Sequence, residues 1–170
     1  MTSTPAAEPS EAVPNLLLRL LQLSKLARQS ESAQALQFLL VNQTHGLASY
    51  TLAAYWVSNE GIVAQSGVSS IERNAPFIQW LNDICTQLSA QQQAIRVTSD
   101  LIAPQDIVQW GEYLPASALW LPIATTAEHP AGLLLCRQEP WEDQDFGLLQ
   151  EWVDIWEHAW LKMHSPTIYG

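Results

Sequence analysis

A short apolar run in the last third of the chain limits the possible folds more than any other feature. Residues 131–136 read Ala-Gly-Leu-Leu-Leu-Cys, with no polar side chain among them. A strand that faces solvent on one side alternates apolar and polar residues, whereas a strand covered on both sides does not. The run therefore predicts a central β-strand over Ala131–Arg137, in a sheet with other elements packed on both faces.

The composition supports a single domain with a large core. The chain has 170 residues, of which 48% are hydrophobic and 14% are charged, and it contains eight tryptophans. Such a chain can bury enough apolar surface to fold as one unit. Seventeen acidic residues against seven basic ones give a net charge of −10. This acidity argues against nucleic acid and anionic lipid as partners.

The N-terminal residues predict no export signal. They lack the basic and apolar regions of a signal peptide. The most apolar stretch, 16–27, is interrupted by polar side chains and is shorter than the roughly 20 residues that span a bilayer. We therefore expect a cytoplasmic protein with no direct membrane insertion, in which Cys85 and Cys136 are reduced thiols. Two cysteines in 170 residues do not make a disulfide scaffold.

The hydrophobic periodicity predicts one domain over 14–164, a disordered tail over 1–13 and a short tail over 165–170. Helices are expected to alternate with two strand hairpins, and Gly46 is expected to end the second helix in a left-handed conformation. Ser58–Gly61 has the composition of a hairpin turn. The predicted helices cover 14–29, 32–43, 76–91 and 143–163, and the predicted strands cover 52–57, 62–68, 95–98, 119–123 and 131–137. The segment 101–116 is expected to be irregular, with one helical turn near 106–110.

The first and last helices each have a wider apolar arc than one core contact requires. We expect each of them to pack on the sheet and also on a second subunit. The last helix has a tryptophan at every fourth position, Trp152, Trp156 and Trp160, so the three rings share one flank. Leucines of the first helix are expected to share one flank in the same way. The predicted dimer interface comprises Leu16, Leu20, Leu23, Trp152, Trp156 and Trp160.

The C-terminal third resembles a GAF domain. The residues that carry this likeness are Leu119-Trp-Leu-Pro-Ile123, then Ala131-Gly-Leu-Leu-Leu135, then Pro140-Trp-Glu-Asp-Gln-Asp145-Phe-Gly-Leu-Leu149. The resemblance implies an α+β, PAS-related fold. In it a central antiparallel sheet carries the terminal helices on one face, and a helix and loop enclosing a ligand pocket on the other. A narrower likeness, in 42–50 and 158–160, is to GAF-like regions associated with membrane-fusion adaptors of secretion and efflux systems.

The resemblance does not extend to the known ligand motifs of the family. Trp141 and Asp145 have the spacing of an aromatic residue and an acid found in cyclic-nucleotide-binding members, but the preceding Asn-Lys pair is missing. Neither cysteine has a neighbouring histidine, as a bilin site requires. Asp154 and His158 lie one helical turn apart, but no further ligands accompany them. We expect no cofactor, no metal and no catalytic site.

The elements that surround the pocket in the family suggest a ligand site here. The candidate ligand-binding residues are Ser66, Ser69, Trp80, Arg96, Trp110 and Tyr113. An aromatic wall with one guanidinium and two hydroxyls would suit a small anionic or aromatic molecule. The alternative is that the large side chains fill the space and nothing binds.

These observations lead to two hypotheses for function. The first is a non-catalytic regulatory or signalling domain that binds an unidentified small molecule and forms a homodimer through its terminal helices. The alternative is a ligand-free protein interaction or scaffold domain, with a secretion or efflux adaptor as its candidate partner. An open cavity would favour the first and a filled one the second.

Overall fold

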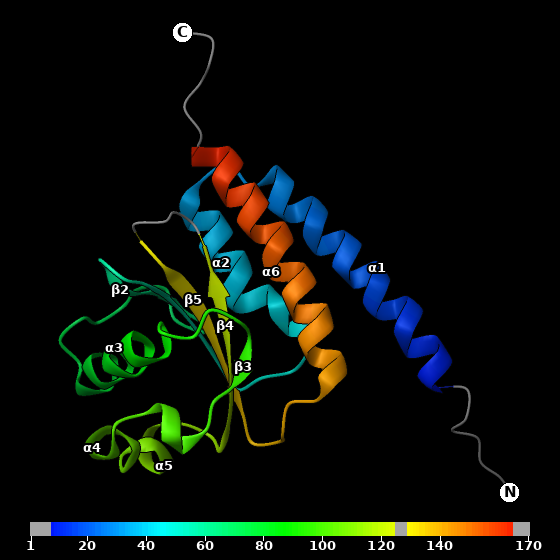
Figure 1. Ribbon diagram of the computed structural model, residues 1–170. Coiled ribbons are helices and arrows are strands. Elements are labelled where there is room, and N and C mark those ends of the chain that lie inside the picture. The colour runs from blue at the N-terminus through cyan, green and yellow to red at the C-terminus, as the bar shows by residue number, and fades with distance from the viewer. Residues whose placement is uncertain (1–7, 125–128, 165–170) are drawn as a thin grey trace, which may run out of the picture.

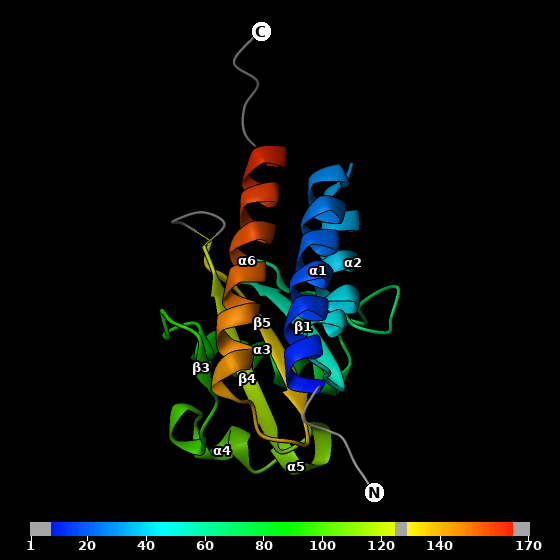
Figure 2. The same ribbon diagram turned by 90° about the vertical axis from the view of Figure 1, so that its right-hand side faces the viewer.

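The computed structural model describes residues 8–124 and 129–164. Within these residues one antiparallel sheet has the strand order β2-β1-β5-β4-β3. Helices cover both of its faces, with α2 and α6 on one side and α3, α4 and α5 on the other (Figure 1). Helix α1 lies outside α2 and α6 and forms a further layer (Figures 1 and 2). This arrangement confirms the expected α+β, GAF-like fold.

The elements agree with the sequence prediction in order and type, except that the segment 101–116, expected to hold one helical turn near 106–110, forms the two short helices α4 and α5. The strands are β1 (Leu52–Val57), β2 (Gly61–Gln65), β3 (Ile95–Arg96), β4 (Ser117–Ile123) and β5 (Ala131–Arg137). The helices are α1 (Glu8–Gln29), α2 (Ala33–Gln43), α3 (Pro76–Leu88), α4 (Pro104–Ile107), α5 (Trp110–Tyr113) and α6 (Asp143–His164).

Strand β5 is central, as its apolar run predicts. It pairs with β1 on one side and β4 on the other, and residues 131–136 are all buried. Its residues alternate between two cores: Leu133 and Leu135 face α2 and α6, while Leu134 and Cys136 face α3. Because both neighbours supply backbone hydrogen bonds and both faces are covered by helices, no polar side chain is needed on this strand.

Strand β1 confirms the predicted alternation. Ala53 and Tyr55 belong to the core under α2 and α6, whereas Ala54 and Trp56 belong to the core under α3. The turn between β1 and β2 has Gly61 at φ +82°. This left-handed conformation strains other residues, which explains a glycine at this position.

Some boundaries differ from the prediction. Helix α1 begins at Glu8, six residues before Pro14, so residues 8–13 are helical and not part of a disordered tail. Proline lacks an N–H, so α1 loses one hydrogen bond at Pro14. Strand β2 ends at Gln65 and α3 at Leu88, both earlier than expected. The remaining tail residues 1–7, the tail 165–170 and the polar connection 125–128 lie outside the described residues.

Gly46 does not end α2 in a left-handed conformation. It closes a 3₁₀ turn, Thr44–Gly46, and its φ is not positive. A Cβ atom at this position would lie 2.9 Å from Cδ of Arg19 on α1, an exposed side chain that can move aside.

Candidate functional site

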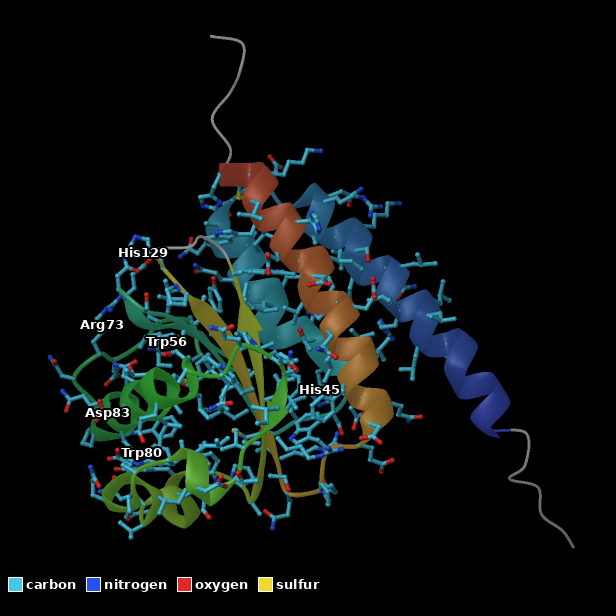
Figure 3. The ribbon with its side chains drawn as sticks, in the orientation of Figure 1. His45, Trp56, Arg73, Trp80, Asp83 and His129 are labelled. Carbon is cyan, nitrogen blue, oxygen red and sulfur yellow. The ribbon has the colours of Figure 1, made fainter. Side chains whose placement is uncertain are left out.

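Three of the six candidate ligand residues come together between α3 and α5. The ring of Trp80 on α3 lies 5.8 Å from that of Trp110 and 5.1 Å from that of Tyr113. Phe77, one turn earlier on α3, lies 5.2 Å from Tyr113. Figure 3 shows Trp80 between α3 and the segment that carries α4 and α5, with Trp56 nearer the sheet. The aromatic wall predicted from the sequence therefore exists.

These aromatic side chains bond to the protein itself. The indole N–H of Trp80 donates to the carbonyl of Asp106 at 2.9 Å, and that of Trp110 donates to the carbonyl of Pro115 at 2.8 Å. Gln87 on α3 also bonds to this segment: its Nε2 donates to the Asp106 carboxylate at 2.7 Å, and its Oε1 accepts from the backbone N–H of Ala103 at 2.6 Å. These contacts fasten α3 to the segment 103–115.

Arg96 does not join this cluster, which corrects its predicted position. In the pairing of β3 with β4, Ile95 lies beside Trp120 and Arg96 beside Leu119. Residues paired across two strands point to the same face of a sheet, and Leu119 belongs to the core under α2 and α6. Arg96 accordingly faces the start of α6, where its guanidinium lies 3.1 Å from the carboxylate of Asp143.

The two serines lie in other places. The hydroxyl of Ser66 accepts a hydrogen bond from the backbone N–H of Ala53 at 2.9 Å, which extends the β1–β2 pairing. Ser69 is exposed and lines a separate groove of about 470 Å³ between α2 and residues 63–71. The six candidate residues thus occupy different parts of the molecule and do not form one ligand site.

A buried tryptophan that the sequence analysis missed lies under α3. Trp120 on β4 has no exposed surface, and its indole Nε1 has no hydrogen-bond partner among the described residues. Its ring crosses over Gly132 of β5, the one position in that strand where a Cβ atom would collide with it. A glycine inside an apolar strand signals such a close approach.

Both cysteines belong to the same core. Cys85 on α3 and Cys136 on β5 are fully buried and unpaired. Burial raises the pKa of each thiol well above its ordinary value. Both thiols are therefore protonated at neutral pH, which makes them poor nucleophiles.

The acidic start of α6 has a structural partner that the sequence analysis also missed. Arg137, at the end of β5, lies 2.9 Å from the carboxylate of Asp145 and stacks over Trp141, with 3.8 Å between the guanidinium carbon and the ring centre. The same guanidinium donates to the carbonyls of Ser49 and Pro140. Trp141 and Asp145 therefore anchor the start of α6 against β5 through their contacts with Arg137.

The predicted dimer interface is largely interior. Leu23, Trp152 and Trp156 are buried within the single chain, so they cannot form an interface. The indole N–H of Trp152 donates to the hydroxyl of Thr44, and that of Trp156 to the carbonyl of Leu36, both at 2.7 Å. Of the six predicted interface residues, Leu16, Leu20 and Trp160 keep partial exposure. The helical period identified the apolar face but could not tell which part of it the fold covers.

Four of the exposed large apolar side chains lie on α1, while Phe38 and Val108 are exposed elsewhere. Leu17, Leu18 and Leu21 are 53%, 54% and 66% exposed, and Leu26 is 47% exposed. Next to the C-terminal half of α1 is a groove of about 560 Å³ between α1 and α6. Its lining is apolar at the base and charged at the rim, and comprises Ala27, Arg28, Ser30, Glu31, Ile155, His158, Ala159, Lys162 and Met163.

Comparison with known proteins defines the fold and no more. No protein-family model and no curated protein matches the sequence. The structure is similar to the GAF domain of an Acinetobacter phosphoenolpyruvate-protein phosphotransferase, with a TM-score of 0.63 and 11% identity over 91% of this chain and 97% of that one. A similar domain from Coxiella burnetii gives 0.59 and 10%, covering 86% and 92% of the two chains. The VqsR LBD domain of Pseudomonas aeruginosa gives 0.57 and 14%, covering 91% and 98%.

The chain therefore has the GAF-domain fold over nearly its whole length. The narrower likeness to regions associated with secretion and efflux adaptors finds no support in these neighbours. Among the described helices, none is both long and apolar enough to cross a membrane.

Proposed function

We propose that this chain is a non-catalytic regulatory domain that acts by forming a homodimer through the outer face of α1. The observation that carries the proposal is the exposure of Leu17, Leu18 and Leu21, each more than half accessible. Fully burying a leucine side chain is worth about 1.5–3 kcal/mol relative to leaving it in water. Three adjacent exposed leucines are therefore costly. A second subunit that covers them recovers much of this free energy.

The fold and the packing under α3 support a role based on association with another protein chain. Regulatory and sensory domains use the GAF fold, and three structural neighbours share it at full length. On the face where that fold encloses a ligand, Trp80, Trp110 and Tyr113 contact one another and use their polar atoms within the chain. Packing of this kind favours the interaction hypothesis over a ligand in that space.

The test is the mass of the protein in solution, measured by size-exclusion chromatography with light scattering. The wild-type chain is expected to be a dimer. Leu21→Glu is expected to shift it to monomer, because the carboxylate would be placed in the apolar interface. Gln34→Glu is the matched control, since it adds the same charge at an exposed position of α2, beside residues 63–71 and away from the outer face of α1. A wild-type protein that stays monomeric at high concentration would overturn the proposal.

One observation favours a second candidate function, the sensing of a small molecule under α3. The buried Trp120 indole N–H has no acceptor among the described residues, and buried donors are nearly always paired. A small molecule with a hydrogen-bond acceptor would satisfy it. Native mass spectrometry beside a denatured sample tests this candidate. An added mass on the wild type that Trp120→Phe loses would support it, and equal, unmodified masses would count against it.

A further inference from the structure

A groove at one edge of the sheet lies apart from the surfaces discussed so far. It has a volume of about 470 Å³ and lies between α2 and residues 63–71, which comprise the end of the outer strand β2 and the segment that follows it. In Figure 2 the chain that leaves β2 extends beside α2. We call this the edge groove. Its described lining includes no residue of α1, α3 or α6, so it is separate from the proposed dimer surface and from the aromatic cluster.

The two walls of the edge groove are fixed to each other. Oδ1 of Asn42 on α2 accepts a hydrogen bond from the backbone N–H of Gly67 at 3.0 Å, and its Nδ2 donates to the carbonyl of Phe38 at 3.2 Å. Gly67 has φ +80°, a conformation that glycine adopts without strain. Next to it, the hydroxyl of Ser66 accepts from the N–H of Ala53 on β1. The segment after β2 is therefore held to α2 and to the sheet, as in a preformed site.

The edge groove is lined without charge, although the whole chain has a net charge of −10. Among its described lining residues there is no Asp, Glu, Lys, Arg or His. An ion bound here would lose water and gain no counter-charge, which is costly. Half of the lining residues have uncharged polar side chains, and these are Ser32, Gln34, Gln37, Asn42, Gln65, Ser69 and Ser70. The groove therefore favours a neutral and polar ligand.

Most of these polar side chains are available to a ligand. Ser32 is engaged, since its hydroxyl accepts from the N–H of Ala35 at the start of α2, and Asn42 holds the walls together. The other five side chains make no hydrogen bond with another described residue. An amide side chain offers donors and an acceptor, and a hydroxyl offers both functions. A matching ligand carries many groups that both donate and accept.

An exposed aromatic ring lies beside these polar groups. Phe38 on α2 is 59% exposed, and Val68 on the opposite wall is 45% exposed. Gln34, Phe38 and Asn42 are four residues apart, so they share one flank of α2. The face of an aromatic ring carries partial negative charge, which favours C–H groups packed against it. The edge groove thus combines an apolar platform with neutral hydrogen-bonding groups.

We propose that the edge groove binds a neutral saccharide. A sugar ring has a face of C–H groups and hydroxyls around its rim, so it can lie on Phe38 while its hydroxyls bond to the amides of Gln34 and Gln37 and to the hydroxyl of Ser69. Each sugar hydroxyl donates and accepts, as the side chains of the groove do. The volume of about 470 Å³ lies within the roughly 300–1,000 Å³ of small-molecule sites.

An extended peptide added to the edge of β2 fits these observations less well. Such a peptide would bond to free backbone groups of the outer strand. Two of these groups already have partners: Oδ1 of Asn82 on α3 accepts from the N–H of Ile62 at 2.7 Å, and the carbonyl of Gln65 accepts from the N–H of Val68 at 3.4 Å. The free hydrogen-bonding groups of the groove are side chains, which suits a ligand recognised by its hydroxyls.

NMR titration of isotope-labelled, full-length protein tests the proposal. Maltose, cellobiose and N,N′-diacetylchitobiose are added separately to about 20 mM, above the millimolar Kd expected of an open site. At least one of these neutral disaccharides is expected to shift the side-chain amide signals of Gln34, Gln37 and Gln65 in a saturable way. The amide signal of Gln22 on α1 should not move.

Two variants locate the binding. Phe38→Ala should weaken it by about tenfold or more, because the aromatic platform is lost. Val108→Ala is the matched control, since it shortens an apolar side chain that is 76% exposed beside α4 and outside the groove lining. Binding by this control should equal that of the wild type, and circular dichroism checks that both variants fold.

The outcomes are distinct. No saturable shift with any of the three disaccharides, or shifts that Phe38→Ala leaves unchanged, would overturn the proposal. Shifts caused by a blocked, uncharged Thr-Val repeat peptide but by none of the sugars would overturn it in favour of strand addition. The inference does not depend on the proposed homodimer, because the edge groove and the outer face of α1 share no lining residue.

Discussion

Replacing Gly132 by alanine is expected to destabilise the domain more than any other single added methyl group in the sheet. A Cβ atom at this position would lie 2.2 Å from both Cη2 and Cζ2 of Trp120, where ordinary contacts are 3.4–4 Å. The overlap exceeds 1 Å. Neither residue can easily move, because Trp120 is fully buried and Gly132 is paired on both sides, with Trp56 and Pro122.

The magnitude follows from what overpacking costs in rigid cores. Inserting one methylene into a well-packed core costs about 1–3 kcal/mol. Since both partners of this contact are held in place, we expect Gly132→Ala to reach the upper end, about 3 kcal/mol. Domains are stable by only about 5–15 kcal/mol. With a slope near 2 kcal/mol per molar urea, the unfolding midpoint should fall by about 1.5 M.

The assay is urea unfolding followed by tryptophan fluorescence and by circular dichroism. Gly147→Ala in α6 is the matched control, because nothing lies within 4 Å of its added Cβ atom. This control should be neutral or stabilising by about 0.5–1 kcal/mol, since alanine favours helix. In a double variant with Trp120→Leu, the alanine should cost much less than it does alone. A Gly132→Ala protein within about 0.5 kcal/mol of wild type would refute the close contact.

Three further changes test other parts of the structure. Thr44→Val should lower the free energy of unfolding by about 1–3 kcal/mol, because it leaves the buried indole N–H of Trp152 without its acceptor. When this change is combined with Trp152→Phe, the two losses of stability should be less than additive. Additive losses would contradict the hydrogen bond. Burial raises the pKa of Glu157 above its ordinary 4.5, so the folded state binds this proton more tightly, and stability should fall as pH rises from about 4.5 through the raised value. Glu157→Gln should flatten this part of the plot of unfolding free energy against pH. An unchanged slope would exclude Glu157 as its source. Arg137→Lys should lower the melting temperature although the charge is kept, because an ammonium cannot replace a guanidinium that bonds three carbonyls and a carboxylate. An unchanged melting temperature would show that the charge alone suffices.

Local patterns predicted the elements well because secondary structure depends on periodicities within one segment. The bounds of β1 and β5 match the prediction, and the alternation along β1 correctly divides its residues between two cores. The acidic first turn and the long apolar face located α6 to within a residue or two. These signals lie within a few residues of one another, and no distant contact is needed to interpret them.

The candidate site was less predictable because it depends on which segments meet. Trp80, Trp110 and Tyr113 were grouped correctly from the resemblance, yet their mutual contacts and internal hydrogen bonds became visible only in the folded chain. Arg96 was assigned to the wrong face, since the direction of a side chain on a two-residue strand follows from its register with β4. Register is a long-range property that no local pattern contains.

The amino-acid sequence by itself determined a central apolar strand, the order of the helices and strands, and the presence of more apolar helix surface than one core needs. Only the tertiary structure decided how that surface is divided: Trp152 and Trp156 are buried, while Leu17 and Leu21 stay exposed. The physical reason is that hydrophobic periodicity specifies a direction on a helix, whereas burial depends on which neighbour occupies that direction. Helix α1 lies on α2 and α6 and leaves its other side open, and that choice creates the surface on which the proposed function depends.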